Sequence, residues 1–147
     1  MSQNIHLFPI TIYGTERLSK IRLPEEQLQY VRFSASIAQY EAAGNPWCFA
    51  VDLDGHCIGY LDAESDSDGD LHINKFVIDQ SYQRQGVGSA AMEEFLQMAR
   101  DSNVDFIFLS VAYGNPAAAR FYQRFGFTDT ELGMAEAGCK LMTLSLR

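Results

Sequence analysis

The run from Gln83 to Ser89, which reads Gln-Arg-Gln-Gly-Val-Gly-Ser, has the composition of an anion-binding turn. It follows a strand-like apolar segment, residues 74–79, and it precedes a segment whose apolar residues recur at helical spacing. Gly86 and Gly88 have no Cβ to block a close approach, and the first turn of a helix offers unpaired N–H donors. Arg84 adds a cation. The pattern predicts a pyrophosphate site between a strand and a helix.

A second run, residues 115–127, follows another apolar segment and predicts a short helix that begins after Asn115 and ends before Gly126. Tyr122 lies seven residues after Asn115. From helical spacing alone, Tyr122 would be interpreted as a core aromatic beside Phe121 and Phe125.

The two runs, in this order and at this spacing, resemble the GNAT acetyltransferase superfamily over residues 71–132. The resemblance implies acetyl-CoA as co-substrate. No metal is expected. The resemblance also implies that the backbone of Phe76, Val77 and Ile78 contacts the acetyl and pantetheine part. The residues implied for the pyrophosphate are Arg84, Gln85, Gly86, Val87, Gly88 and Ser89. Asn115 matches the asparagine that contacts pantetheine in the family.

Tyr122 matches the general acid of the family, and its ordinary pKa of about 10 keeps the hydroxyl protonated at neutral pH. The fold implied is α/β (α+β), with a mixed, mostly antiparallel sheet of six to seven strands, splayed central strands and flanking helices. The implied reaction is direct attack of an amine on the thioester, without a covalent enzyme intermediate.

The proton acceptor is not identified by the motifs. Some family members carry glutamates at the positions of Asn74 and Ser110, and neither of these residues can act as a base. His72 lies on the same strand face as Asn74, and an ordinary pKa of about 6.5 would allow it to accept a proton. The alternatives are a solvent-exposed histidine without a role, Glu26 or Glu64 as the base, and a chain of water molecules, which is the default.

Residues 23–31, 46–51 and 76–83 resemble the spermine/spermidine and diamine acetyltransferase branch. This implies a primary amine as acceptor, with a di- or polyamine favoured. Glu25, Glu26 and Tyr30 could recognise an ammonium through charge pairing and a cation–π contact, although a helix N-terminus commonly holds such residues. Two alternatives stay open: acetylation of a protein N-terminus or amino-acid-like amine, and a non-catalytic acyl-CoA sensor.

Acidic residues occupy every second position from Asp62 to Asp70, so they could line one side of a hairpin and attract a polyamine. A solvated loop is the favoured interpretation. A calcium loop that starts at Glu64 would put Lys75 where a bidentate glutamate is needed.

Composition places the chain in an ordinary class. Its 147 residues, 47% hydrophobic, are expected to form a single domain over 1–147. A net charge of −8 argues against nucleic acid as a partner. No apolar stretch approaches the roughly 20 residues of a membrane span, and residues 1–6 lack a signal-peptide pattern, so a cytoplasmic location is expected. The three cysteines indicate neither disulfides nor zinc. A homodimer is compatible with the family.

The remaining elements are expected as follows. Residues 5–12 form a strand with Pro9 at an edge or bulge, and residues 24–43 form a helical region. Asp54-Gly55 joins two strands in a β-hairpin. Residues 71–78 and 104–111 are central strands, and residues 127–132 pair with 140–146.

Overall fold

The computed structural model describes residues 4–14, 16–30, 33–132 and 138–147. The chain divides into two compact units, residues 1–63 with 75–99 and residues 64–74 with 100–147. Its seven strands form a mixed sheet in the order β1-β2-β3-β4-β5-β7-β6. The expected α/β fold with a mixed, mostly antiparallel sheet is confirmed. Each unit is described by itself below, and the single domain over 1–147 stays a prediction.

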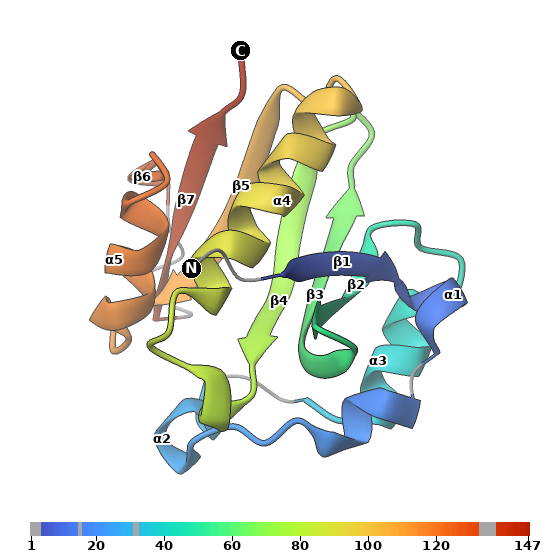
Figure 1. Cartoon of the computed structure of the whole chain (residues 1–147). Coiled ribbons are helices and arrows are strands. Elements are labelled where there is room, and N and C mark those ends of the chain that lie inside the picture. The colour runs from blue at the N-terminus through green and yellow to red at the C-terminus, as the bar shows by residue number, and fades with distance from the viewer. Residues whose placement is uncertain (1–3, 15, 31–32, 133–137) are drawn as a thin grey trace. The chain divides into compact units, whose positions relative to one another are not determined.

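The first unit is built on an antiparallel β-hairpin. Its strands are β1 (Ile5–Pro9), β2 (Cys48–Leu53), β3 (His56–Ser65), whose last two residues belong to the second unit, and the second half of β4 (Leu71–Ile78). β1 pairs with β2, and β2 pairs with β3, both antiparallel. Asp54 and Gly55 both have positive φ, 51° and 89°, as a type I′ turn requires. The hairpin predicted at this dipeptide is confirmed (Figure 1).

The helical elements of this unit are α1 (Ile10–Tyr13), η1 (Glu16–Lys20), α2 (Glu25–Leu28), α3 (Ala35–Ala42), η2 (Gln80–Tyr82) and α4 (Val87–Asp101), whose last two residues belong to the second unit. The strand expected over 5–12 was wrong beyond Pro9. Proline has a fixed φ and no N–H for the ladder, and Pro9 is the residue from which α1 starts.

The single helical region expected over 24–43 was also wrong, because two separate helices occupy it. α2 ends at Leu28. The Ser34 hydroxyl accepts a hydrogen bond from the Ile37 N–H at 3.1 Å, and the Ser34 carbonyl accepts one from the Ala38 N–H. Ser34 therefore caps the start of α3, as serine at this position commonly does.

Apolar side chains of the first unit are buried on both faces of its strands. On one face, Cys48, Ala50, Tyr60 and Val77 cluster with residues of η1 and α3. Elsewhere, Trp47, Phe49 and Phe95 of α4 meet edge to face, with ring centroids 6.0–6.3 Å apart. The buried residues of α4 are Val87, Ala91, Met92, Phe95, Leu96 and Ala99, which confirms the predicted apolar stripe.

The second unit contains the first half of β4 with β5 (Phe106–Ala112), α5 (Pro116–Gln123), β6 (Thr128–Asp129) and β7 (Cys139–Ser145). β4 and β5 run parallel and pair over Leu71–Ile73 and Ile107–Leu109. β5 pairs with β7 along its whole length, and α5 contacts β5 (Figure 1). The pairing expected for 127–132 with 140–146 is confirmed at its centre, but β6 spans only two residues.

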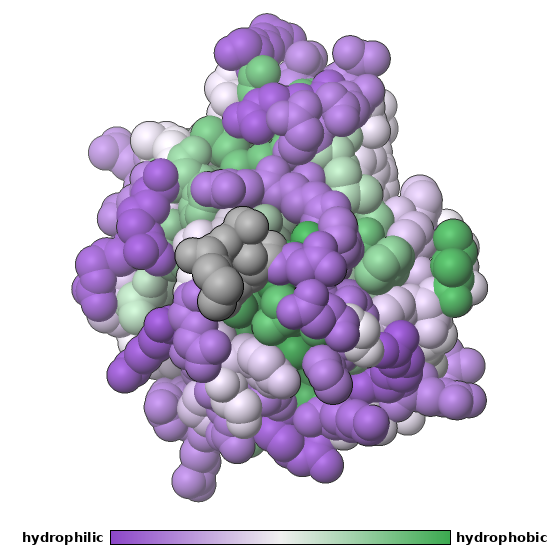
Figure 2. Space-filling view, viewed as in Figure 1, coloured by the Kyte–Doolittle hydropathy of each residue, from purple (hydrophilic) through white to green (hydrophobic). Residues whose placement is uncertain are grey.

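No helix in the described ranges is long and apolar enough to cross a membrane. On the face shown in Figure 2, hydrophilic side chains predominate and apolar ones appear in small patches between them.

Gly59 of β3 allows the close approach of β4. A Cβ at this position would lie 2.5 Å from the Val77 carbonyl oxygen and 3.2 Å from the Val51 Cβ. We therefore expect Gly59→Ala to lower the free energy of unfolding by about 1–3 kcal/mol through overpacking, measured by urea denaturation. Ser65→Ala, at the exposed end of the same strand, is the control and should change it by less than about 0.5 kcal/mol. Equal stability of the two variants would show that β3 can move away from β4 without cost.

Candidate functional site

The turn from β4 to α4 has an unusual backbone. Arg84 and Gly86 both have positive φ, 63° and 79°, and the strain at Arg84 is notable because L side chains rarely adopt this conformation. The Gln85 side-chain amide donates to the Ser81 carbonyl at 3.1 Å, and the Ala90 N–H donates to the Gly86 carbonyl at 3.1 Å. Turns of this kind direct successive N–H groups to one side, where an anion can bind.

The start of α4 carries no acidic residue in its first turn. The N–H groups of a first helical turn lack intrahelical acceptors, so those of Val87, Gly88 and Ser89 suit a phosphate. Val87 itself is buried and anchors this end of the helix, whereas Arg84, Gln85 and Gly86 are exposed. In the first unit, the structure thus brings the six expected pyrophosphate residues together in one turn.

The strand before this turn ends in a segment of mixed exposure. Val77 is buried, whereas Phe76 and Ile78 are half-buried. The Ile78 carbonyl accepts a hydrogen bond from the Gln83 side-chain amide at 2.8 Å. This contact ties the end of β4 to the turn that follows.

A pair of glutamines joins α2 to the same turn. The amide groups of Gln27 and Gln83 exchange two hydrogen bonds, of 3.1 and 3.2 Å. Glu25 and Glu26, which precede Gln27 in the same short helix, are exposed, and Tyr30 just beyond the helix is 39% exposed. The three residues expected to recognise an ammonium are therefore at the surface, Glu25 and Glu26 in α2 and Tyr30 just after it. Gln27 connects this helix to the anion-binding turn.

In the second unit, His72 is held by a carboxylate. Its Nε2 lies 3.0 Å from Asp66 Oδ2, and its ring stacks on Phe108 with centroids 5.1 Å apart. Asp66 Oδ1 accepts hydrogen bonds from the backbone N–H groups of Asp68 and Asp70. These contacts, with that of His72 the largest, lower the pKa of Asp66. With Nε2 engaged, Nδ1 is the ring nitrogen of His72 that could accept a proton.

The acidic run from 62 to 70 does not form one face. Asp62 is buried within β3, Glu64 is exposed near the end of that strand, and Asp66, Asp68 and Asp70 lie in or next to the turn that follows. Ligand atoms of these last three residues lie within 4.8 Å of one another. Because Asp66 is engaged by His72 and by the turn, its carboxylate serves as a local cap.

Tyr122 lies on α5 of the second unit among aromatic rings. Phe121 and Phe127 contact it edge to face, with centroids 5.2 and 5.6 Å away. Burial raises the pKa of the Tyr122 hydroxyl above its ordinary value, so the group stays protonated throughout the neutral range. The group is therefore a proton donor at neutral pH.

Asn115 caps α5. Its side-chain oxygen accepts a hydrogen bond from the Ala118 N–H at 3.3 Å, and Pro116 occupies the first position of the helix, as is common. The cap uses the oxygen, so the amide nitrogen is the part of this side chain that could still contact pantetheine.

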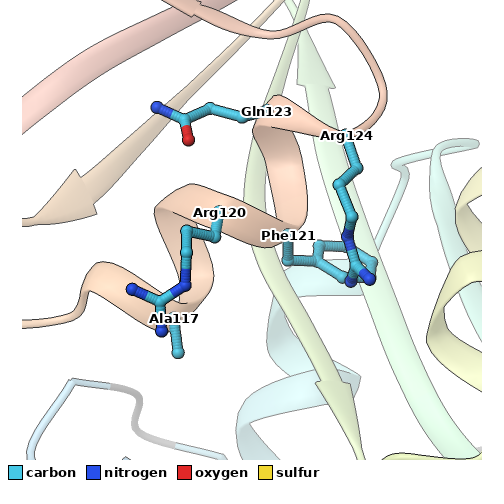
Figure 3. Close-up of a pocket in the computed structure, with 5 residues that line it drawn as sticks. All are labelled: Ala117, Arg120, Phe121, Gln123 and Arg124. Atoms are coloured by element: carbon cyan, nitrogen blue, oxygen red, sulfur yellow. The ribbon is translucent and has the colours of Figure 1, made fainter.

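Residues of α5 and its C-cap border a pocket of about 540 Å³. Its lining residues are Ala117, Arg120, Phe121, Gln123 and Arg124 (Figure 3). The Arg124 guanidinium lies over the Phe121 ring, 5.4 Å from its centroid. Neither Asn115 nor Tyr122 belongs to the lining, so we do not place the expected chemistry in this pocket.

Sequence reasoning missed a buried polar cluster in the first unit. Asp62 and Tyr60 of β3 are 1% and 0% exposed, and neither the Tyr60 hydroxyl nor either Asp62 oxygen has a hydrogen-bond partner among the described residues. Nearby, Lys75 Nζ lies 2.5 Å from Glu41 Oε1. The available signal was an aspartate inside the apolar run of residues 57–63, which the alternation of acids from 62 to 70 obscured.

The chain is similar to several known acetyltransferases. Spermine/spermidine N(1)-acetyltransferase of Bacillus subtilis is 28% identical over 134 residues, which cover 84% of this chain and 88% of that protein. The solved structure of PaiA N-acetyltransferase from Thermoplasma acidophilum in complex with coenzyme A superposes with a TM-score of 0.77 at 15% identity, over 99% of each chain. Ribosomal-protein-S18-alanine N-acetyltransferase of Escherichia coli superposes with a TM-score of 0.75 at 19% identity, over 99% of this chain and 94% of the other.

A family model extends this comparison over most of the chain. The model of the Acetyltransferase (GNAT) family matches residues 15–127. The match includes both the turn from β4 to α4 and the helix that carries Tyr122. The chain belongs to the GNAT acetyltransferase family.

Proposed function

We propose that the protein transfers the acetyl group of acetyl-CoA, the co-substrate of its family, to a primary amine, and that a di- or polyamine is the acceptor. The observation that carries the proposal is the turn with two positive-φ residues, Arg84 and Gly86, directly before the N-terminus of α4. This backbone is suited to a pyrophosphate. No structural need for the backbone strain at Arg84 is evident, and strain of this kind is common at binding sites.

The proposed cofactor contacts follow from this turn and from α5. Arg84, Gln85, Gly86, Val87, Gly88 and Ser89 would bind the pyrophosphate. The backbone of Phe76, Val77 and Ile78, together with the Asn115 amide, would contact the pantetheine arm. Hydrogen bonds from a preorganised backbone to an anion cost little reorganisation.

Tyr122 is the proposed general acid. A neutral amine attacks the acetyl carbon, the carbon–sulfur bond breaks, and the departing thiolate needs a proton. Burial raises the pKa of the Tyr122 hydroxyl, so the group is protonated at neutral pH, which is the state that a donor to the sulfur needs. For the amine proton, the acceptors considered from the sequence are His72, which Asp66 orients, Glu26, Glu64 and a chain of water molecules, with water as the default.

The polyamine acceptor is supported by the surface around α2 and by the spermine/spermidine relative. Glu25 and Glu26 are exposed and adjacent, and the Gln27–Gln83 pair fastens their helix to the proposed pyrophosphate turn. Two carboxylates beside Tyr30 can attract an extended cation.

A protein N-terminus is the second candidate acceptor. The E. coli ribosomal-protein-S18-alanine N-acetyltransferase shares the fold. A sensor that binds acyl-CoA without turnover is a third reading, which Tyr122 and Asn115 disfavour. The homodimer and the cytoplasmic location expected from the sequence stay predictions.

Replacing Tyr122 with phenylalanine removes the proposed acid and keeps the aromatic packing. We expect kcat to fall by about 100-fold or more, measured as release of CoA thiol, while the acetyl-CoA Kd stays within about twofold. Tyr113→Phe alters an exposed tyrosine of the same unit and is the control. Unchanged kcat in the Tyr122 variant would remove this residue from the chemistry.

Gly86→Ala should weaken acetyl-CoA binding by about tenfold or more, equivalent to about 1.4 kcal/mol, because a side chain at positive φ distorts the turn that the pyrophosphate would meet. Calorimetric titration measures this. Gly69→Ala introduces the same kind of strain at φ 82°, also with open space around it, and should leave Kd unchanged. Equal Kd values for both variants would contradict the proposed pyrophosphate site.

The double variant Glu25→Gln/Glu26→Gln should raise KM for spermidine about three- to tenfold at low salt, with a smaller effect at high salt because exposed charges are screened. Glu16→Gln/Glu93→Gln, which removes two other exposed carboxylates of the same unit, is the matched control. The assay is CoA release with spermidine and with N-terminal peptides. Turnover with peptides but not with polyamines would show that a protein N-terminus, and not a polyamine, is the acceptor.

A further inference from the structure

The helix α2 is attached to the rest of the first unit mainly through one side chain. None of its four residues is buried. Gln27 is half-buried, and the exposed residues are Glu25, Glu26 and Leu28. A helix of this length is not stable by itself, so its position is set by contacts with other elements. Among the described residues, the only hydrogen bonds that join α2 to another element are the two between Gln27 and Gln83.

Gln83 lies between this helix and the backbone that is proposed to bind the pyrophosphate. Its amide nitrogen donates to Gln27 Oε1 at 3.2 Å and to the Ile78 carbonyl at 2.8 Å, and its amide oxygen accepts from Gln27 Nε2 at 3.1 Å. The next residue is Arg84, whose φ is 63°. Because Gln83 and Arg84 share one planar peptide unit, a ligand that fixes the backbone at Arg84 also restricts Gln83.

A second connection holds the chain before α2 to the same stretch. The Arg22 N–H donates to Asp79 Oδ1 at 2.6 Å, and the Gln80 N–H donates to the Arg22 carbonyl at 2.7 Å. Asp79 is buried, so this connection belongs to the core of the unit. The glutamine pair, in contrast, is half-buried and reaches the turn itself. It is therefore the contact of α2 that responds to what binds at the turn.

The residues proposed to recognise the amine are next to Gln27 in the chain. Glu25 and Glu26 precede it, and the Tyr30 N–H donates to the Gln27 carbonyl at 3.0 Å. Binding an extended, flexible cation costs conformational freedom on both sides, so carboxylates that are already held in place bind it more tightly than mobile ones. A turn that is ordered by its own ligand can thus improve the amine site through Gln83 and Gln27.

We propose, as a step that rests on the proposed function, that the Gln27–Gln83 pair couples the two substrate sites. Acetyl-CoA bound at the turn restricts Gln83, Gln83 holds Gln27, and Gln27 holds α2 with its two carboxylates in the position that binds the amine. Gln27 and Gln83 are positioning residues, because they act through α2 and through the turn. Coupling between two ligands is reciprocal, so a bound amine tightens acetyl-CoA binding by the same factor.

The first test needs no acceptor. Hydrogen–deuterium exchange of the whole protein, with and without CoA, is followed by mass spectrometry in peptides that cover residues 22–30 and 83–90. We expect CoA to slow exchange about fivefold or more in both peptides of the wild type. In Gln27→Met, which keeps the length of the side chain and removes its two hydrogen bonds, CoA should slow exchange only in 83–90. Gln29→Met is the matched control, because the Gln29 amide donates to the Glu26 carbonyl of its own segment, and it should respond as the wild type does.

The second test measures the coupling itself. Calorimetric titration gives the Kd of spermidine for the free protein and for its complex with CoA. We expect CoA to lower this Kd about fivefold or more in the wild type and less than about twofold in Gln27→Met. At saturating acetyl-CoA, the KM for spermidine should rise about fivefold in Gln27→Met, while kcat stays within about twofold. Gln83→Met should lose the coupling as well, and the double variant should lose no more than either single one.

The outcomes separate the two claims. CoA that slows exchange in 83–90 but not in 22–30 of the wild type overturns the coupling and leaves the proposed pyrophosphate site intact. The same conclusion follows if Gln27→Met keeps the wild-type response. CoA that slows exchange in neither peptide, or a wild-type protein that neither binds nor acetylates spermidine, overturns the proposed function and the coupling together. Because Gln27 lies on a surface helix, its substitution leaves the core intact, and thermal unfolding of the variant verifies this.

Discussion

The buried carboxylate of Asp79 organises the part of the first unit on which acetyl-CoA binding is proposed to depend. One oxygen accepts a hydrogen bond from the Arg22 N–H at 2.6 Å and the other accepts one from the Ser81 N–H at 3.0 Å. The backbone N–H of Asp79 donates to the Ile58 carbonyl at 2.6 Å. One residue thus joins the end of β4, the start of the turn, the segment before α2 and the neighbouring strand β3. Such contacts can hold the strained backbone at Arg84 in place.

The first unit holds polar groups in two different surroundings, at the exposed turn before α4 and on strands β3 and β4. The turn after Asp79 exposes polar backbone at the start of α4, and α2 is fastened to that turn by Gln27 and Gln83. On strands β3 and β4, Asp62 is buried without a hydrogen-bond partner among the described residues, whereas Lys75 forms a partly exposed ion pair with Glu41 of α3. A buried carboxyl without a partner is costly in its charged form.

Local signals made much of the fold predictable from the sequence. Asp54-Gly55 predicted the hairpin because few other dipeptides tolerate two positive φ angles. The turn around Gly86 and the helix after Asn115 were predictable because their caps and glycines are specific in type and position. The break between α2 and α3 was not predicted, because Ser34 was not recognised in the sequence as the cap that its hydrogen bond with the Ile37 N–H makes it. Pro9 was expected at an edge or a bulge; it lies at the end of the edge strand β1, where the chain leaves the sheet.

The candidate site was less predictable because burial and pairing are tertiary properties. Alternation from residue 62 to residue 70 suggested one acidic face, but β3 ends at Ser65, so Asp62 is in the core and Asp66 begins a turn. The partner of His72 could not be predicted from strand alternation, because Asp66 reaches it only through that turn. Tyr122 carries no local mark that separates it from a core aromatic, and only its spacing from Asn115 indicated a role.

The most direct test of the central claim is a competition experiment. The protein is incubated with acetyl-CoA labelled with carbon-13 in the acetyl group and an equimolar mixture of spermidine, amino acids and N-terminal peptides, and mass spectrometry identifies the labelled product. The account predicts label on spermidine in amounts equal to the CoA formed. Label on a peptide N-terminus, or bound acetyl-CoA that stays intact with every acceptor, would contradict it.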